Sequence, residues 1–353
     1  MTGQENIKTT DIGALGKNSL IQRLTQDFET QNKTTLSGLG DDATAVGSGQ
    51  KKSVVGTAMM VEGIHFDMTY TPLQHLGYKA VALAMAKVVA MNALPRQIIV
   101  NMAVSSRYSV EALEELFAGI RRVCHRYDTD LAGCDICSSM SGLTISVTAI
   151  GETEKASITR CDGAKVHDLL CASGDFGSAY AGLLILEREK ATFKANPNFQ
   201  PDFASHEYVL ERFLKPEPRT DIVKWLAENS IVPTAMTNVA DGLADAAMRL
   251  CKESHCGCEI YEERIPIDYG TSHVCSDFGT NMLPVSLALN GGMDNELLFS
   301  IKQSDYEKIK DCPNIAIVGH ITEQNRGTIM VTPQNTAIEL TSQGWNPSTP
   351  ANE

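Results

Sequence analysis

The first half of the chain alternates short apolar runs with longer stretches of helical character. Runs rich in apolar and β-branched residues predict strands at residues 53–66, 97–104 and 143–150. Residues 74–93 are apolar almost throughout and predict a helix that the Leu94-Pro95 pair should end. After Ser109, a candidate N-cap, apolar residues recur with the helical period over 113–127. The pattern therefore predicts strands separated by two helices.

A polar, turn-rich segment at residues 151–163 marks the expected boundary between two domains, 1–152 and 153–353. The elements predicted after it are a strand at 168–173, helices at 177–189 and 241–251, and short strands near 258–261, 296–301, 315–318 and 328–331. Strands and helices mix in both halves, so we expect an α/β fold with α+β character.

The composition is that of a globular protein large enough for two cores, with 353 residues of which 43% are apolar. Acidic residues outnumber lysine and arginine by 43 to 30, and the net charge is −13. This surplus argues against general nucleic-acid binding, although a local site can still hold a small phosphorylated ligand. Residues 1–20 lack the apolar segment of a signal peptide, and no stretch approaches the about 20 apolar residues of a membrane span. We therefore expect a cytoplasmic protein with no membrane partner.

The ten cysteines are expected to be mostly reduced thiols, because no secretion signal accompanies them. Two groups have spacings that suggest a redox or zinc site, namely Cys134 with Cys137, and Cys251, His255, Cys256 and Cys258. A zinc site usually presents two well-spaced pairs. These groups are far apart in the sequence and the second has unsuitable internal spacing, so zinc is disfavoured.

Four local features carry candidate chemistry. The turn at residues 38–42 ends in Asp41-Asp42, a carboxylate pair that suits Mg²⁺ but also fits a plain surface turn. The turn at 174–177 precedes a helix and either presents free N–H groups to an anion or is only a tight connection. Asp241 fits a helix N-cap better than a ligand. Lys87, the one charge in an apolar run, faces a polar cavity or, as we favour, the exposed edge of a helix.

Seven segments, read together, are more specific than any one of these features. They are GLGDDATAV (38–46), VEGIHF (61–66), YKAVALAMAKVVAMNALP (78–95), LAGCDICSS (131–139), SGDFGSAYAGL (173–183), NVADGL (238–243) and NGGMDNELLF (290–299). In this order they resemble the motifs of thiamine-monophosphate kinases, a family within the superfamily of aminoimidazole ribonucleotide synthetase. The resemblance extends from about residue 12 to Asn346.

The resemblance implies a two-domain aminoimidazole ribonucleotide synthetase-like fold and an ATP- and Mg²⁺-dependent phosphotransferase. The implied reaction moves the γ-phosphoryl group of ATP onto thiamine monophosphate and gives thiamine diphosphate. Such chemistry needs clustered carboxylates that hold metal ions. Two phosphate-bearing anions must be brought together, and the charge of the transition state must be neutralised. The resemblance also implies a homodimer in which the N-terminal domain binds metal and ATP and its sheet pairs with that of a second subunit.

The resemblance assigns roles to individual residues. The matching positions are Asp42, Asp135 and Asp241 as catalytic, metal-binding carboxylates, Thr57 as a further metal ligand, Cys134, Asp135 and Arg160 at the nucleotide, and His65 and Trp345 at the thiamine substrate. They are expected to form a single site, in which Asp42 and Asp135 face Asp241 or the 174–177 turn.

Several ligand positions of the family are replaced here. The replacements are Gly56 and Ala58 for a serine and an aspartate, Lys87 for an aspartate, Asn238 and Ala240 for an aspartate and a serine, and Met293 and Asn295 for a glutamate and a tyrosine. Loss of carboxylates should weaken Mg²⁺ binding. The chain is then either a kinase with a reduced metal set, in which Lys87 touches phosphate in place of an ion, or a catalytically impaired relative. Such a relative would bind nucleotide or thiamine phosphate or act as a dimeric interaction protein, while another reaction of the superfamily fits less well.

Overall fold

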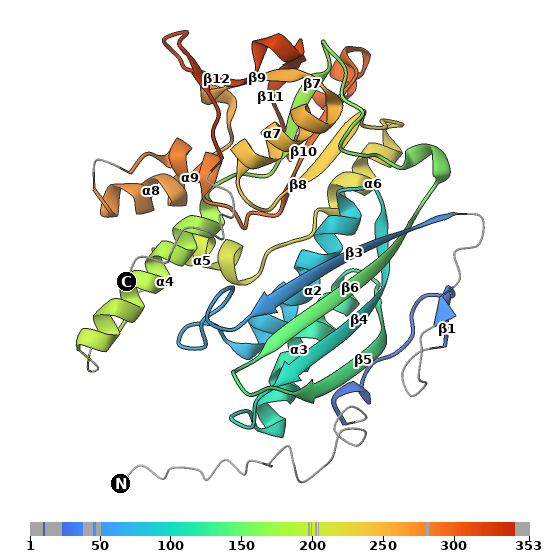
Figure 1. Cartoon of the computed structure of the whole chain (residues 1–353), viewed down its shortest axis with the longest axis vertical. Coiled ribbons are helices and arrows are strands. Elements are labelled where there is room, and N and C mark those ends of the chain that lie inside the picture. The colour runs from blue at the N-terminus through green and yellow to red at the C-terminus, as the bar shows by residue number, and fades with distance from the viewer. Residues whose placement is uncertain are drawn as a thin grey trace. The chain divides into compact units, whose positions relative to one another are not determined.

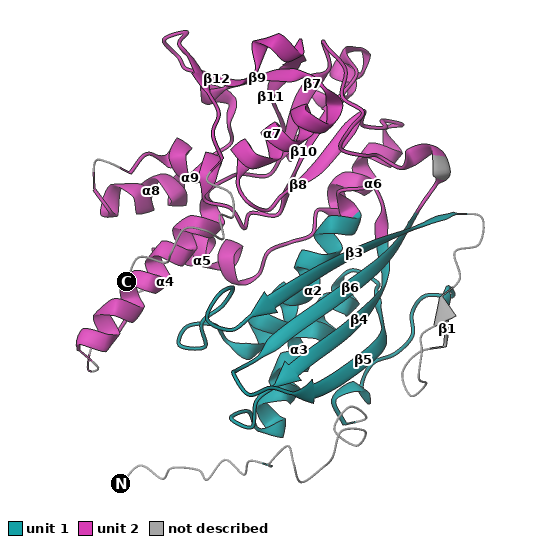
Figure 2. Ribbon diagram, in the orientation of Figure 1, with its two compact units in different colours: residues 1–88, 95–152 teal, residues 89–94, 153–353 magenta. Residues whose placement is uncertain are grey.

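The computed structural model of the chain describes residues 10, 23–37, 45–46, 51–196, 198, 200–201, 203, 205–279 and 282–342. The chain divides into two compact units, which are described separately (Figure 2). Unit 1 comprises residues 1–88 and 95–152, and unit 2 comprises residues 89–94 and 153–353. Among the described residues, no helix combines the length and the apolar character needed to cross a bilayer.

Unit 1 is a four-stranded sheet with two helices on one face (Figure 1). In sheet order the strands are β3 (Lys52–Val61), β6 (Thr144–Thr153), β4 (Leu94–Val104) and β5 (Asp130–Ser138), and the helices are α2 (Leu73–Val89) and α3 (Val110–Arg126). A separate short pair joins β1 (Thr35–Ser37) and β2 (Ala45–Val46). Strand β4 runs parallel to β5. The face away from the helices is called the open face below.

The apolar pattern explains this arrangement. Ile145, Val147 and Ala149 of β6 are buried and alternate with half-buried polar residues, as expected for a sheet with one covered face. The N-cap of α3 is Ser109, whose hydroxyl accepts a hydrogen bond from the backbone N–H of Ala112, so this prediction is confirmed.

Unit 2 is built on a seven-stranded mixed sheet (Figure 1). In sheet order its strands are β13 (Ala337–Glu339), β12 (Thr328–Val331), β9 (Gly257–Tyr261), β11 (Ile315–Thr322), β7 (Leu169–Ser173), β10 (Glu296–Ile301) and β8 (Ala235–Val239). Its longer helices are α4 (Ser178–Ala195), α5 (Glu207–Leu214), α6 (Thr220–Glu228), α7 (Leu243–Ser254), α8 (Tyr269–Asp277) and α9 (Pro284–Asn290). The short elements are η2 (Lys155–Ser157), η3 (Glu262–Arg264), η4 (Gln303–Asp305), α10 (Tyr306–Ile309) and η5 (Gln324–Arg326).

Both faces of the unit 2 sheet are covered by apolar clusters. On one face, Leu250 of α7 packs with Ile260 and Val318 of the sheet. On the other face, Leu226 of α6 packs with Phe299 of β10. Strands buried on both faces are typical of α/β layers. The predicted mixed α/β class is confirmed.

Candidate active site

Thr57 and Asp135 both lie on the open face of the unit 1 sheet. A Cβ built on Gly56 would lie 3.2 Å from the carbonyl oxygen of Ala84 in α2, so Gly56 faces the helix and the exposed Thr57 faces away. Asp135 pairs in register with Asn101 of β4, and both side chains are exposed. β3 and β5 are the two edge strands, so three strand spacings separate Thr57 from Asp135 by roughly 14 Å. One chain therefore does not bring these two residues around one ion.

The three replaced positions of unit 1 are neighbours. Lys87 is exposed in the last turn of α2, and its Cβ would lie 2.9 Å from a Cβ built on Gly56. Ala58 is half-buried two residues further along the same side of β3. The glycine allows α2 to approach β3 closely, so Lys87 lies at an exposed helix edge beside this strand.

His65 lies in the turn that follows β3. It is exposed, its Nδ1 accepts a hydrogen bond of 3.1 Å from the backbone N–H of Val61, and its own N–H donates to the Val61 carbonyl. Glu62 anchors this turn by accepting hydrogen bonds from Tyr108, Arg107 and the N–H of Leu143. Burial opposes ionisation of Glu62, but these donors outweigh it and lower its pKa. The sequence did not point to Glu62, because its partners are distant along the chain.

Cys134, next to Asp135, is a half-buried free thiol, and Cys137 is an exposed free thiol. Burial, with a smaller contribution from the charge of Asp135, raises the pKa of Cys134 to about 12. Cys134 is therefore protonated at neutral pH and a poor nucleophile or metal ligand. Neither cysteine forms a disulfide in the structure, and their reduced state in solution stays a prediction.

In unit 2, three predicted segments meet where β7 and β8 end and β10 begins, and this end of the sheet is called the unit 2 edge below. β10 runs antiparallel to both β7 and β8, so its amino end lies beside their carboxyl ends. This topology places the loops 174–177, 240–242 and 291–295 side by side. Contacts confirm this, since the N–H of Met293 donates to the carbonyl oxygen of Ala240 at 2.6 Å. A Cβ on Gly292 would lie 2.9 Å from the same oxygen, so only a residue without a side chain fits there.

The turn before α4 does not offer its N–H groups to an external anion. The N–H groups of Gly177 and Ala179 donate to the carboxylate of Asp294 at 2.8 and 3.1 Å, and the N–H of Phe176 donates to a carbonyl group. Asp294 is fully buried, and burial raises its pKa to about 7, although Arg212 and the two N–H donors oppose this shift. The anion-site hypothesis for this turn was therefore wrong: an internal carboxylate occupies the helix N-terminus.

Glu296 forms a second buried charge centre at this edge. Its carboxylate is 1% exposed and pairs with the guanidinium groups of Arg212 on α5 and Arg219 at the start of α6. The hydroxyl of Ser173 also donates to it. Burial lowers the pKa values of both arginines, but the charge of Glu296 and other acidic neighbours raises them above their ordinary value. Both arginines are therefore engaged in ion pairs with Glu296.

Asp241 and Asn238 are two further described residues at this edge whose side chains carry oxygen atoms. Asp241 is exposed and does not cap α7, whose N-cap is Gly242, so the N-cap interpretation was wrong. The Asn238 amide donates to Asn295 Oδ1 at 3.1 Å, while its own Oδ1 is buried and accepts no hydrogen bond. Amide and carboxylate oxygens are both ligand types that a hard cation such as Mg²⁺ accepts. These two residues carry the ligand types that Mg²⁺ takes, and they belong to β8 and to the loop that follows it.

The side chain of Arg160 makes no hydrogen bond or ion pair with the three loops at this edge, all of which the structure describes. Its guanidinium is exposed and pairs with the carboxylate of Asp162, with 3.0 Å from Nε to Oδ1. Asp42 and Trp345 lie outside the described residues.

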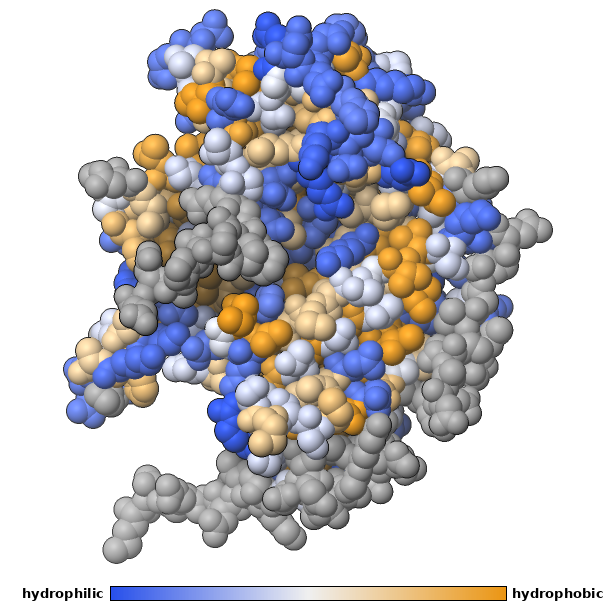
Figure 3. Space-filling model, viewed as in Figure 1, coloured by the Kyte–Doolittle hydropathy of each residue, from blue (hydrophilic) through white to orange (hydrophobic). Residues whose placement is uncertain are grey.

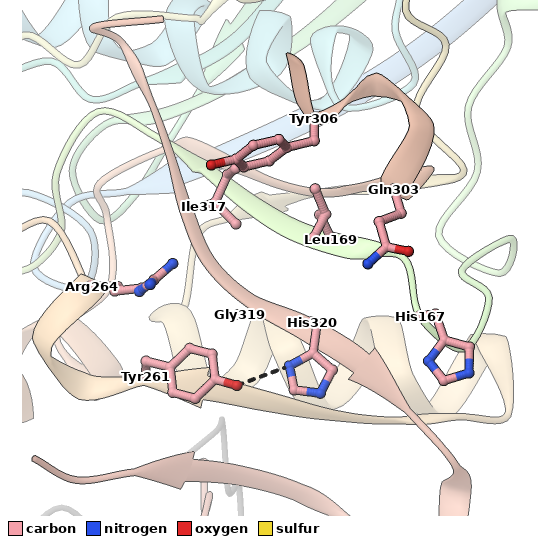
Figure 4. A pocket seen from close by; sticks show the side chains of 9 residues that line it. All are labelled: His167, Leu169, Tyr261, Arg264, Gln303, Tyr306, Ile317, Gly319 and His320. Atoms are coloured by element: carbon pink, nitrogen blue, oxygen red, sulfur yellow. Dashed lines mark hydrogen bonds between the residues drawn. The ribbon is translucent and has the colours of Figure 1, made fainter. Parts of the chain in front are cut away.

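A pocket of about 380 Å³ lies elsewhere in unit 2, on one face of β7, β11 and β9 (Figure 4). Tyr261 donates to or accepts from His320 Nδ1 at 3.3 Å, and the two rings are stacked at 6.0 Å. Arg264 lies over the Tyr261 ring at 5.6 Å. The lining includes Leu169 at the amino end of β7, whereas the edge described above lies at its carboxyl end. The pocket contains none of the predicted site residues.

Comparison with known proteins identifies the family of the chain. Residues 40–153 match the family described as AIR synthase related protein, N-terminal domain. A thiamine-monophosphate kinase of Synechococcus elongatus is 31% identical over 293 residues, which cover 81% of this chain and 84% of that protein. The chain belongs to the thiamine-monophosphate kinase family.

Two further members are similar over most of their length. The thiamine-monophosphate kinase of Bacillus subtilis is 29% identical over 317 residues, covering 88% of this chain and 92% of that protein. The structure of AaThiL complexed with AMPPCP and TMP superposes with a TM-score of 0.71 at 26% identity, covering 94% of this chain and 97% of that one. The predicted family and its fold are therefore confirmed.

Proposed function

We propose that this chain is a thiamine-monophosphate kinase that transfers the γ-phosphoryl group of ATP to thiamine monophosphate and forms thiamine diphosphate. The observation that carries the proposal is the match over 94% of the chain to a kinase structure complexed with AMPPCP and TMP. AMPPCP is an analogue of ATP, so that relative binds the two classes of ligand that the proposed reaction requires.

The residues of the unit 2 edge divide into two groups by their role. Asp294 and Glu296 are buried and bonded within the protein, so they hold the loops in place and do not contact a ligand. Asp241 is exposed, and Asn238 carries the orphaned oxygen. These two residues would hold Mg²⁺, which when bound neutralises charge on the phosphate groups.

Positive charge for phosphate contact comes from other residues. Arg212 and Arg219 are committed to Glu296, whereas Arg160 and Lys87 have exposed side chains. We assign Arg160 to the nucleotide, as the family resemblance suggests. We assign Lys87 to a phosphate group, because an ammonium group binds phosphate as a point charge.

Steady-state phosphoryl transfer with thiamine monophosphate, ATP and Mg²⁺ tests the proposal. Asp241→Asn should lower kcat/KM by at least about tenfold, since each 1.4 kcal/mol of lost transition-state stabilisation is a factor of ten. Asp311→Asn, an exposed aspartate of unit 2 outside the edge, is the matched control and should leave turnover unchanged. Failure of the wild-type chain to form thiamine diphosphate at any Mg²⁺ concentration would refute the proposal.

A non-catalytic relative is the alternative, and the replaced ligand positions beside β3 favour it. Calorimetric titration with ATP, with and without Mg²⁺, separates the two. Lys87→Asp should strengthen Mg²⁺-dependent ATP binding if Lys87 stands where an ion would be, because like charges within about 4–6 Å disfavour each other. Equal binding of Mg-ATP by both proteins makes Lys87 an ordinary surface lysine.

The open face of unit 1 supports the proposed homodimer. Apolar surface gathers over this sheet (Figure 3), and it includes Val55 and Met59 of β3, which are 61% and 59% exposed. Exposed β-face residues of this kind mark an association surface. A second copy against this face would also add its own donors to Thr57 and Asp135, which one chain holds roughly 14 Å apart. Light scattering of the wild type and of a Met59→Glu variant tests this: the dimer should be lost in the variant.

A further inference from the structure

A cluster of three metal-binding side chains lies in unit 2 outside the edge described above. It consists of His206, which precedes α5, and of His273 and Asp277, one turn apart on α8. One donor atom of each lies within 4.8 Å of the other two. Asp277 Oδ2 is 3.7 Å from His206 Nε2 and 3.7 Å from His273 Nδ1. The cluster is therefore arranged around one point.

These distances are close to those of a tetrahedral transition-metal site. Two ligands that are each about 2.0–2.1 Å from a tetrahedral zinc ion lie roughly 3.3 Å apart. The two carboxylate-to-imidazole distances of 3.7 Å exceed this value by a few tenths of an ångström, and the two imidazole nitrogens lie within 4.8 Å of each other, so side-chain torsions must draw the three donors together. The i,i+4 spacing of His273 and Asp277 places both on one face of α8, so the helix itself supplies two ligands without rearrangement.

The burial of the donors also points to a ligand. His206 is only 6% exposed, although histidine side chains carry two polar nitrogens. His273 Nδ1 is shielded from solvent and makes no hydrogen bond within the described part of the chain. A buried, unsatisfied ring nitrogen that faces a carboxylate and a second imidazole is costly unless something binds it.

We propose that His206, His273 and Asp277 form a binding site for a divalent late transition metal, for which zinc is the probe. Two neutral imidazoles and one carboxylate are the donor set that such ions prefer over Mg²⁺ or Ca²⁺. The side chains of His273 and Asp277 are 42% and 34% exposed, so water can supply the fourth ligand. The site is independent of the proposed kinase reaction.

The position of the cluster suggests what the ion does. α8 packs on α4 and α5. One residue after His206, α5 begins, and its Tyr208 donates to the carboxylate of Asp175 in the 174–177 turn. From α8, Thr271 shares a hydrogen bond of 2.8 Å with Ser178, which also contacts Asp175. A metal that joins His206 to α8 would hold together the two elements that support this turn.

Cobalt binding tests the proposal directly. The full-length protein is freed of metal with a chelator and titrated with Co²⁺ at about pH 7.5, where imidazole is mostly neutral. We expect one equivalent with visible ligand-field bands of a tetrahedral ion, no sulfur-to-cobalt charge-transfer band, and displacement by Zn²⁺. Zinc should also raise the melting temperature, because an ion that binds only the folded state stabilises it.

Matched variants assign the site. His273→Ala and the near-isosteric Asp277→Asn should each weaken zinc binding by more than the roughly 10–100-fold that loss of an outer-shell partner costs. His125→Ala, an exposed histidine on α3 of unit 1, should change nothing. A sulfur charge-transfer band, unchanged affinity in both cluster variants, or no cobalt binding by the wild type would each overturn the proposal.

Discussion

Gly174→Ala should strongly destabilise unit 2, because the added methyl group meets a side chain that cannot move away. Gly174 has a φ of +55°, and a Cβ there would lie 2.4 Å from the carboxyl carbon of Glu296. The end of a glutamate side chain can usually move, but this one is held by Arg212, Arg219 and Ser173. Alanine must therefore adopt a left-handed backbone and also displace a buried carboxylate from its arginines.

The magnitude follows from these two costs. A non-glycine residue in a sparsely populated backbone region costs about 1–3 kcal/mol, and breaking a buried ion pair costs about 3–5 kcal/mol, so the sum is about 4–8 kcal/mol. Gly327→Ala is the control, because Gly327 has a φ of +71° but no atom within 4 Å of its added Cβ. That variant should lose only the backbone cost of about 1–3 kcal/mol.

Urea unfolding, followed by circular dichroism and by the fluorescence of Trp225 on α6, measures both losses. A double-mutant cycle locates the cause: in a Glu296→Ala background, Gly174→Ala should cost only about 1–3 kcal/mol. The reasoning fails if Gly174→Ala costs no more than Gly327→Ala, or if its cost is the same with and without Glu296.

Three further predictions concern protonation and thiol reactivity. Burial raises the folded-state pKa of Asp294 from 3.8 to about 7, so its contribution to the free energy of unfolding is present at low pH and is lost as the pH rises through about 7. In urea unfolding curves measured between these pH values, Asp294→Asn should remove this decline in the free energy of unfolding. Burial lowers the folded-state pKa of Lys79 to about 7 from 10.5, so the free energy of unfolding should rise between these pH values, and Lys79→Met should flatten the rise. Thiol titration of the denatured, unreduced protein should find ten thiols. In the native protein, an aromatic disulfide reagent should react first with the exposed Cys137, and Cys137→Ser should remove this fast phase of the reaction.

Elements with a strong local pattern could be predicted from the sequence, and those that depend on distant pairing could not. The alternating β6 and the capped α3 were both expected near their observed positions. Strand β5 was missed, because its Gly133-Cys134-Asp135 centre has no alternation and it is held by parallel pairing with β4. The predicted helix over 74–93 ends earlier, at Val89, because Asn92 adopts a φ of 56°, and Leu94-Pro95 opens β4 instead.

The candidate site was predictable as a set of segments but not as a network. The motif order placed 174–177, 238–243 and 290–299 in one functional group, and the sheet topology of unit 2 does bring these loops to one edge. The motif order could not show that Asp294 caps α4, since Asp294 lies 117 residues after Gly177, whose N–H it accepts. Nor could it show the pairing of Glu296 with Arg219, 77 residues away.

This division of roles explains how ligand positions can change while the fold persists. At the unit 2 edge, the buried carboxylates Asp294 and Glu296 are retained and bonded internally. Of the four positions that differ from the family there, Asn238, Ala240 and Met293 are only half-buried, and Asn295 is buried. Replacing a half-buried side chain usually costs less folding free energy than breaking a buried, paired network. Replacing a buried, paired carboxylate leaves unpaired charge and costs several times more. Folding therefore constrains the internal network of Asp294 and Glu296, whereas the exposed Asp241 is constrained chiefly by what it binds, so a variant of Asp241 can lose turnover without losing stability.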